Sequence, residues 1–490
     1  MSNSPLAVAI QNIKRRSMSI NKPLEPESIL LLLLVLIAFV TRLYFLYDLS
    51  LIQYDGTYYI RYFFGEKSWG GPFPFGYPLL IQAAHLIIQD EVIAARLVST
   101  VFGSLLVVPL FGLLKRVTDF RIAAILVLIV AIHPGLIRFS TQSLSDIPYL
   151  YFWLLGFNYY YRGKIIHAVA AESVAYFIRP EGLIFAGSFL LIYFIREKNF
   201  VKSFYGGLVI LAALSIFMIH THDRTGTWTI SGKAGNLKVF YIDNWQKNEE
   251  IGGKESSFET VIDNLVNQYP KRVVVISEYI VQLTTWPLVI IGLIGFFIKP
   301  SVYWIILIQF FLTPLSGANY DLRYGLPYFL ILILGVGLFI SHFNALYKYR
   351  YSIILLGAFA FFMNLKYIQD KYLLTPDERF IELKEIGLKL RAGGYSKFKI
   401  MDRKPYTAFF AGSEKFVFLP YGSINNMLAK ANEEAVDLIV MHAGIIRIFR
   451  PQLVPLLFVA DSVVSPQLIT IYNDISIRRE SGIRIFKVTK

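Results

Sequence analysis

The stretch SILLLLLVLIAFVTRLYFLY, residues 28–47, indicates what kind of protein this is. It is apolar over about the 20 residues that a helix needs to cross the core of a bilayer. The residues before it carry four cations: Lys14, Arg15, Arg16 and Lys22. Because positive charge is retained on the cytoplasmic side, we predict a first span at 28–48 that starts in the cytoplasm. No small-residue cleavage site follows the run, so we interpret it as an anchor rather than a signal peptide.

Further apolar blocks follow, and the loops predicted to be cytoplasmic are short and basic, as the orientation rule requires. The blocks predict ten more spans, at 91–114, 121–139, 147–161, 165–178, 183–195, 204–220, 280–298, 302–316, 326–341 and 352–366. A shorter stretch at 76–89 contains Pro78 and His85, and we expect it to lie partly in the membrane interface. The sequence therefore predicts a polytopic α-helical membrane protein with about eleven transmembrane helices.

Composition agrees with this class and excludes others. The chain has 490 residues, of which 55% are hydrophobic, and a formal net charge of +14. Much of the positive surplus lies in short loops between apolar blocks, so it indicates membrane orientation rather than binding of nucleic acid. The chain has no cysteine, which excludes disulfides and thiolate metal sites.

The domain organisation follows from the same pattern. Residues 1–366 form the predicted transmembrane domain, with external loops at 49–90 and 221–275. Parity places the N-terminus in the cytoplasm and residues 367–490 outside, in a multi-pass protein of the cell membrane. The latter region has helical patterns at 376–391 and 423–434. It also has strand-like runs at 398–401, 415–419, 437–441, 456–459, 468–472 and 483–488. We predict a small extracytoplasmic α/β domain.

Two acidic residues are predicted to lie at the external ends of spans. Asp55 stands in YDGTYY, residues 54–59, just after the first span, and Asp146 stands in SLSDIP, residues 143–148. An ionised carboxylate at the membrane surface can act as a general base for a substrate hydroxyl. Each acid could instead cap a helix, Asp146 with Pro148 in the first turn. From the residues alone, both interpretations stay open.

Several cations are also predicted on the external side, close to the ends of spans. They are Arg61, Lys67, Arg179 and Arg323. Arginine binds phosphate through a planar fork of donors, so several on one face indicate an anionic ligand. The alternatives are snorkelling to the interface, or pairing with Glu181 and Asp321.

Two other motifs each allow more than one interpretation. The segment GPFPFGYP, residues 71–78, has an irregular backbone fixed by three prolines, and it could shape a lipid-facing groove or serve as a rigid connection. The run HTHD, residues 220–223, invites a metal interpretation, but we favour an ordinary polar exit from a span. No Walker loop and no dinucleotide fingerprint is present in the sequence.

Taken together, these motifs resemble the GT-C class of membrane glycosyltransferases. More narrowly, the chain looks like the protein-mannosyltransferase-like family that includes the bacterial aminoarabinose transferases for lipid A. The resemblance is one of layout and covers about residues 25–366. Its parts are one helix, the acidic loop at Asp55, the proline segment, Asp146-Ile147-Pro148, Arg179-Pro180-Glu181-Gly182, and the late Arg323-Tyr324 before Pro327.

The resemblance implies a reaction and roles for particular residues. Members of the family take a sugar from a polyprenyl-phosphate carrier at the external leaflet. Asp55 corresponds to the expected base and Asp146 to a second acid. Many relatives have another acid directly after the first, where this chain has Gly56. We therefore name no metal ligands, and a divalent metal is a doubtful cofactor.

The resulting hypothesis is transfer of a sugar to an acceptor hydroxyl with inversion. We expect Arg61, Lys67, Arg179 and Arg323 to bind the donor phosphate. Five residues are expected to line a lipid or sugar groove: Tyr58, Tyr59, Tyr77, Pro78 and Glu181. Expected partners are a polyprenyl-phosphate-sugar, membrane lipids, and a glycan, lipid or protein acceptor. The alternatives are a transporter or flippase of lipid-linked saccharides, and another GT-C reaction such as oligosaccharide polymerisation or ligation.

Overall fold

The computed structural model describes most of the chain. The described residues are 25–46, 52–64, 69, 73–231, 258–298, 308–309, 321–342, 380–458, 465–475 and 482–489. The predicted span at 352–366 lies outside them, as does nearly all of the predicted span at 302–316.

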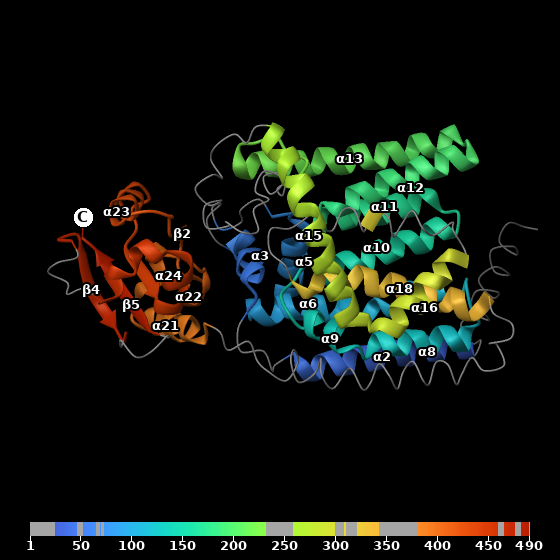
Figure 1. Cartoon of the computed structure of the whole chain (residues 1–490), viewed down its shortest axis with the longest axis horizontal. Coiled ribbons are helices and arrows are strands. Elements are labelled where there is room, and N and C mark those ends of the chain that lie inside the picture. The colour runs from blue at the N-terminus through green and yellow to red at the C-terminus, as the bar shows by residue number, and fades with distance from the viewer. Residues whose placement is uncertain are drawn as a thin grey trace, which may run out of the picture.

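The larger part of the structure is a body of roughly parallel and antiparallel helices (Figure 1). Four helices among the described residues are long and apolar enough to cross a membrane, or up to six if each bent pair is one span. The four are α2 (Pro26–Phe45), α6 with α7 (Glu91–Leu105 and Val107–Leu114), α13 (Phe200–Thr225), and η3 with α18 (Leu322–Gly325 and Leu326–His342). The mainly helical fold is confirmed, and the count of about eleven spans stays a prediction.

One bent pair is α8 (Phe120–Ala131) with α9 (Pro134–Ser140), which meet at 58°. Pro134 cannot continue a helical ladder from α8, but it suits the first turn of a new helix. The ring of His133 accepts a hydrogen bond from the Leu136 amide at 3.2 Å and so caps α9. The predicted span at 121–139 is therefore broken near its end.

The other bent pair is α15 (Phe258–Thr284) with α16 (Trp286–Ile298), where the axes of Tyr269–Thr284 and Trp286–Ile298 meet at 105°. Thr285 between them has a φ of 70°, a left-handed conformation that no helix interior allows. The predicted span at 280–298 is therefore broken at Thr285, where the chain turns sharply.

Three shorter helices follow one another through the body. They are α10 (Asp146–Tyr161), α11 (Ile165–Ile178) and α12 (Glu181–Glu197), and α11 packs against the other two and against α13. Two short helices, α3 (Tyr54–Phe64) and α5 (Gly76–His85), lie at the left-hand end of the body (Figure 1). That end carries the starts of α6 and α10.

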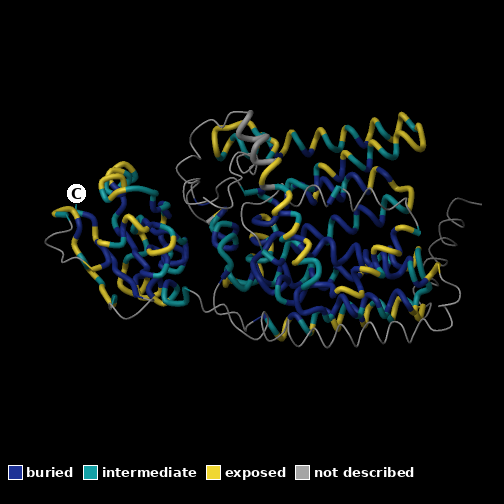
Figure 2. The backbone as a smooth tube through the Cα atoms, in the orientation of Figure 1, coloured by how far each residue is buried: buried dark blue, intermediate teal, exposed yellow. Residues whose placement is uncertain are grey.

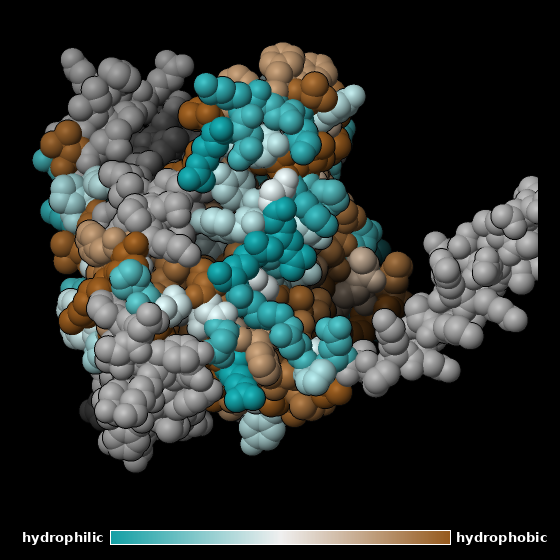
Figure 3. Space-filling view, turned by 90° about the vertical axis from the view of Figure 1, so that its right-hand side faces the viewer, coloured by the Kyte–Doolittle hydropathy of each residue, from teal (hydrophilic) through white to brown (hydrophobic). Residues whose placement is uncertain are grey.

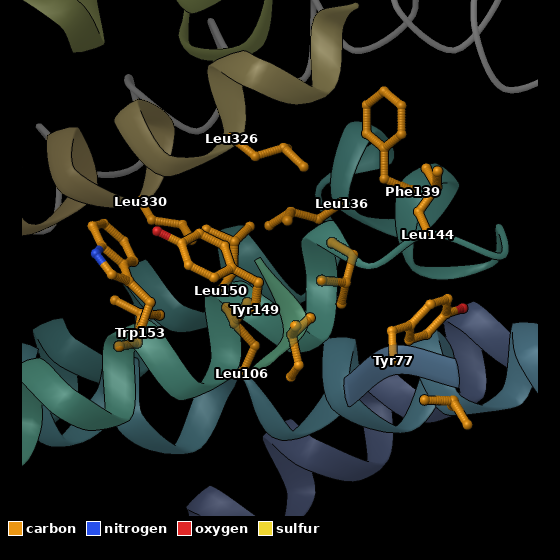
Figure 4. Close-up of a cluster of buried hydrophobic side chains, with 14 of the residues drawn as sticks. Tyr77, Leu106, Leu136, Phe139, Leu144, Tyr149, Leu150, Trp153, Leu326 and Leu330 are labelled. Atoms are coloured by element: carbon orange, nitrogen blue, oxygen red, sulfur yellow. The ribbon is translucent and has the colours of Figure 1, made fainter. Parts of the chain in front are cut away.

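Burial divides the helices into interior and peripheral ones (Figure 2). Helix α18 is buried along most of its length, whereas α2 and α13 expose large apolar side chains such as Leu36 and Leu211. Exposed apolar faces are what lipid-facing helices require. Figure 4 shows Leu136, Tyr149 and Leu326 among the side chains that meet in the interior.

Helices α16 and α18 cross with their backbones in close contact. A Cβ atom placed on Gly295 would lie 1.8 Å from the carbonyl oxygen of Gly335. Small residues allow such backbone contact between membrane helices, which associate by packing rather than by a hydrophobic driving force.

Residues 380–489, which we call the C-terminal unit, contain a five-stranded sheet and lie at one end of the helical body (Figure 1). The strands are β1 (Ile400–Asp402), β2 (Phe416–Phe418), β3 (Leu438–His442), β4 (Leu468–Asn473) and β5 (Ile483–Val488). Their order is β2-β1-β3-β5-β4. Strand β1 runs parallel to β2 and β3, while β5 pairs antiparallel with β3 and β4.

Helices and short 3-10 turns connect these strands. They are α21 (Ile381–Ala392), η5 (Tyr395–Lys397), α22 (Tyr406–Ala411), α23 (Ile424–Glu433), α24 (Ala443–Phe449), η6 (Pro451–Leu453) and α25 (Pro455–Phe458). The strand predicted at 456–459 was wrong, because Pro455 starts a helical turn that buries Leu456 and Leu457 in the core of the C-terminal unit.

The opposite end of the helical body faces the viewer in Figure 3, where hydrophilic residues gather between hydrophobic flanks. Among the described residues, the cations Arg162 and Lys164 stand in the turn between α10 and α11. Because Asp146 begins α10 at the other end, this turn lies far from the C-terminal unit. Arg162 and Lys164 thus lie at the end opposite the C-terminal unit, and the orientation of the body in the membrane stays a prediction.

Candidate active site

Four segments far apart in the sequence meet at the end of the helical body that faces the C-terminal unit. Asp55 lies in the first turn of α3, and Asp146 is the first residue of α10. Arg179 follows the last residue of α11 in an extended conformation. Arg323 lies in η3, where the side chain of Asp321 accepts a hydrogen bond from the Arg323 amide at 3.2 Å.

These residues form an alternating series of carboxylates and guanidinium groups, which we call the ionic chain. Arg323 donates from Nη2 to Asp55 Oδ2 at 2.8 Å, and its Nη1 lies 3.5 Å from Asp146 Oδ2. Arg179 donates from Nη1 to the other oxygen of Asp146 at 2.5 Å. Its Nη2 donates to Glu181 Oε1 at 3.2 Å. The ionic chain therefore runs Asp55, Arg323, Asp146, Arg179, Glu181.

The ionic chain is shielded from solvent, but not uniformly. The side chain of Asp146 is 9% exposed and that of Asp55 is 25% exposed, the largest value in the ionic chain. Shielded charges are tolerated when they are paired and hydrogen-bonded. A small cavity of about 30 Å³ lies against Asp146, Arg179 and Arg323. Asp321, whose Oδ2 lies 3.7 Å from Arg323 Nε, is more open still at 37% exposed. Within the ionic chain, Asp55 is the most accessible carboxylate.

Two glycines allow the segments to approach this closely. A Cβ atom on Gly56 would lie 2.8 Å from the Cβ of Ser143, in the turn that leads into α10. A Cβ atom on Gly182 would lie 2.4 Å from the backbone nitrogen of Tyr176. A second acidic side chain at position 56 would therefore push α3 away from α10, which gives a steric reason for the glycine.

The residues of this site do not suit a divalent metal ion. Guanidinium groups occupy the spaces between successive carboxylates of the ionic chain. In the part of the chain that the structure describes, no three side chains of His, Asp or Glu gather closely enough to hold a metal ion.

Arg61 and Lys67 were expected beside Arg179 and Arg323. Arg61 lies elsewhere, with Nη1 3.9 Å from Glu91 Oε2 and with Nη2 donating to the Phe409 carbonyl at 3.3 Å. Lys67 lies outside the described residues. Of the three cations that lie among the described residues, Arg179 and Arg323 belong to the ionic chain.

The tyrosines expected in a groove have different surroundings. The Tyr59 hydroxyl lies 2.8 Å from Ser145 Oγ, next to Asp146. Tyr58 stacks on Phe73, with ring centroids 5.5 Å apart, and touches Phe416 of the C-terminal unit.

Tyr77 and Pro78 are both buried, as is the side of α5 on which they lie. The Tyr77 hydroxyl donates to the Ala95 carbonyl of α6 at 2.9 Å. Neither residue reaches the ionic chain, whereas Glu181 is its last member.

The two histidines of the 220–223 run face different partners. His220 Nε2 lies 2.9 Å from the Tyr62 hydroxyl, and His222 stacks on Trp228 with ring centroids 4.2 Å apart. Both contacts are those of an ordinary polar and aromatic helix end.

Sequence reasoning missed two tyrosines and one contact with the C-terminal unit. Tyr149 and Tyr324 line the small cavity beside the ionic chain. Tyr149 follows Asp146 by three residues, so helical spacing could have placed both on one face. Lys404 lies with its Nζ 4.9 Å from the centroid of the Tyr54 ring, next to Asp55. No signal in the sequence indicates that the segment with Lys404 lies beside the segment with Tyr54.

Comparison with known proteins relates this arrangement to a family. Residues 60–177 match the family model described as dolichyl-phosphate-mannose-protein mannosyltransferase. The matched segment includes Asp146, begins after Asp55 and ends two residues before Arg179. No curated protein matches the chain in sequence.

Two solved structures are similar in fold. The archaeal oligosaccharyltransferase AglB from Archaeoglobus fulgidus, solved with an inhibitory peptide and a dolichol-phosphate, has a TM-score of 0.55 and 12% identity, covering 88% of this chain and 72% of that one. ArnT from Cupriavidus metallidurans, solved with undecaprenyl phosphate, has a TM-score of 0.46 and 11% identity, covering 93% and 97%. With the match at 60–177 and the fold shared with AglB, the resemblance to the GT-C membrane glycosyltransferases is confirmed.

Proposed function

We propose that this protein is a glycosyltransferase that moves a sugar from a polyprenyl-phosphate-linked donor to an acceptor hydroxyl, with inversion. The observation that carries the proposal is the ionic chain, which joins the expected base Asp55 to two arginines suited to phosphate. The family match at 60–177 and the complex of AglB with a dolichol-phosphate support a lipid-phosphate donor.

In the proposed reaction, Asp55 acts as the general base. A carboxylate oxygen of Asp55 takes the proton of the acceptor hydroxyl while the hydroxyl oxygen attacks the anomeric carbon. The bond between that carbon and the donor phosphate oxygen breaks, and its electron pair leaves with the polyprenyl phosphate. Asp55 is the most exposed carboxylate of the ionic chain, which supports its role in meeting the acceptor.

The leaving phosphate gains negative charge as the bond breaks, so it needs cations more than a proton donor. Arg179 and Arg323 supply two guanidinium groups whose forked donors match phosphate oxygens. Asp146 accepts from both arginines and so fixes their spacing. We assign Asp146 the role of a positioning residue for the phosphate-binding pair.

Arg323 also links donor binding to the base. In the described structure its Nη2 is bonded to Asp55 at 2.8 Å. A donor phosphate would compete with Asp55 for this guanidinium, since each carries oxygen acceptors of the same kind. The competition would free a carboxylate oxygen of Asp55 to accept a proton once the donor is in place.

We place the reaction at the external face of the membrane. The ionic chain lies at the end of the helical body next to the C-terminal unit, and Lys404 of that unit contacts Tyr54. The basic turn at 162–164 lies at the opposite end, which the orientation rule assigns to the cytoplasm. The C-terminal unit is then extracytoplasmic, where it can guide the acceptor.

The test replaces Asp55 with Asn in proteoliposomes that contain a radiolabelled undecaprenyl-phosphate sugar and candidate acceptors. We expect loss of transfer by about 10²–10⁴-fold, the usual contribution of a general base, with donor binding retained. The matched control is Asp223→Asn, at the end of α13. Transfer by Asp55→Asn at the rate of the control would refute the base assignment. Uptake of donor without acceptor-dependent release of undecaprenyl phosphate would point to transport instead.

A further inference from the structure

A second and much larger cavity lies where the C-terminal unit meets the helical body. Its volume is about 820 Å³. The helical body contributes Arg61 of α3 and residues around the start of α6, from Gln89 to Arg96. The C-terminal unit contributes residues of α21 and α22. The ionic chain is no part of its lining, so the cavity is a separate site.

Among the described residues that line this cavity, positive charge exceeds negative charge. Four cations line it: Arg61, Arg96, Lys384 and Arg391. The two carboxylates are Asp90 and Glu91. One oxygen of Asp90 already accepts from the amides of Val92 and Ile93, at 2.9 and 2.8 Å, and so caps α6.

The two cations of the C-terminal unit lie on one face of helix α21. Lys384, Leu388 and Arg391 line the cavity and are spaced by four and three residues, which places them on one side of a helix. Leu383 and Leu390 are buried on a neighbouring side. The hydrophobic face of α21 thus anchors the helix, and the adjacent face presents positive charge to the helical body.

Arg61 brings a third cation toward this face. Its side chain is 15% exposed, and burial is the main cause that lowers its pKa. The charge of Glu91 at 3.9 Å raises the pKa of Arg61, and the charge of Arg391 lowers it to a smaller extent. Like charges that approach in a partly enclosed space repel each other, and an anion bound between them relieves that repulsion.

We propose that this cavity binds a phosphate group carried by the acceptor. Arginine forks and a lysine at separate positions around a cavity suit a phosphate, and the exposed Leu388 suits an adjoining apolar part. Helix α3 connects the two sites, because Arg61 follows Asp55 by six residues, or about 9 Å along the axis. The acceptor would thus hold its phosphate at least about 9 Å from the hydroxyl that reacts, because the two side chains also point in different directions around the helix. The binding of a phosphate group is argued from the cavity alone. The identification of the acceptor as the molecule that carries this phosphate rests on the proposed function.

The first experiment measures binding by native mass spectrometry of the full chain in detergent. The probes are phosphatidylglycerol and glucose 6-phosphate, with diacylglycerol as the uncharged comparison. We expect Arg391→Gln and Lys384→Gln each to weaken probe binding by about tenfold, the effect of one lost charge-assisted hydrogen bond. Lys389→Gln, on the same helix but away from the cavity, should bind as the unmodified chain does.

The probes identify the source of the phosphate. Binding of phosphatidylglycerol alone indicates a lipid head group, whereas binding of both probes indicates the phosphate itself, and either result supports the site. Equal affinity in Arg391→Gln, Lys384→Gln and Lys389→Gln overturns the proposal. Diacylglycerol bound as tightly as phosphatidylglycerol overturns it too.

The second experiment separates this site from the ionic chain. Undecaprenyl phosphate should bind Arg391→Gln normally, while Arg179→Gln should lose undecaprenyl phosphate and keep both cavity probes. If Arg179→Gln binds undecaprenyl phosphate normally, the donor site in the proposed function fails while the cavity site stands. If Arg391→Gln loses undecaprenyl phosphate along with the probes, the cavity is no separate site and the inference fails.

Discussion

Replacement of Arg323 by lysine separates the charge of this residue from its two-armed geometry. The guanidinium holds Asp55 with one nitrogen at 2.8 Å and approaches Asp146 with the other at 3.5 Å. A lysine ammonium keeps the positive charge, but it is a compact point charge without the planar fork. Arg323→Lys therefore retains attraction to both acids while losing their fixed spacing.

The size of the effect follows from the geometry. At 2.8 Å and an effective dielectric of about 20, the gross attraction between Arg323 and Asp55 is about 6 kcal/mol. Desolvation offsets most of it, so a charge-assisted hydrogen bond contributes about 1.5–3 kcal/mol net. In the proposed reaction Arg323 makes a bond of the same kind to the donor phosphate. Its loss in the transition state lowers transfer by roughly 10–150-fold, since about 1.4 kcal/mol corresponds to tenfold.

The assay is transfer of a radiolabelled sugar from undecaprenyl phosphate in proteoliposomes. We expect Arg323→Lys to lose about 10–150-fold and Arg323→Gln to lose more, because removal of the charge also leaves carboxylates unpaired. Arg116→Lys, in the turn between α7 and α8, is the matched control.

A double-mutant cycle strengthens the test. Asp55→Asn combined with Arg323→Gln should lose less than the product of the two single effects, because the residues act through one contact. Wild-type transfer by both Arg323 variants, or strict additivity in the cycle, would refute the link between donor binding and base.

Three further predictions concern stability and local contacts. Gly295→Ala should lower the free energy of unfolding by about 1–3 kcal/mol, visible as a lower melting temperature in detergent, since the new Cβ would meet the Gly335 carbonyl; an unchanged melting temperature contradicts this close crossing. Burial raises the pKa of Asp402 to about 7, above its value in the unfolded chain. The folded protein therefore binds the proton more tightly, and its stability should fall as the pH rises from about 4 to 7. In Asp402→Asn the melting temperature should depend less on pH over this range, and an equally steep dependence contradicts the assignment. Tyr59→Phe removes a 2.8 Å contact with Ser145 and should lower the free energy of unfolding by about 1 kcal/mol. Transfer should fall by less than about fivefold, and a much larger loss would make Tyr59 part of the reaction.

The positions of the site residues at the ends of helices made part of the site predictable from the sequence. Asp55, Asp146, Arg179 and Arg323 each stand at the boundary of an apolar run, so orientation alone assigns them to one side of the membrane. Their pairing could not be predicted, because apolar periodicity gives neither the order nor the rotation of packed helices. The ionic chain depends on both.

Arg61 illustrates the same limit within one helix. It shares the external side and the α3 helix with Asp55, yet six residues rotate it by about 240° around the axis, away from Arg323. The sequence shows that Asp55 and Arg61 are six residues apart. This spacing places the two side chains on different faces only once α3 is known to be a helix with a buried face. The break at Thr285 was hidden for a different reason, since threonine seldom adopts a positive φ and gives no local warning.

The ionic chain also has a consequence for the order of synthesis. Asp55 and Asp146 leave the ribosome long before Arg323, which completes the alternation of charge. Until the segment with α18 enters the membrane, Asp55 has no guanidinium partner within the ionic chain. If the proposed function holds, a partly made protein therefore carries an incomplete phosphate-binding pair, and catalytic competence arrives only when insertion of the helical body is nearly finished.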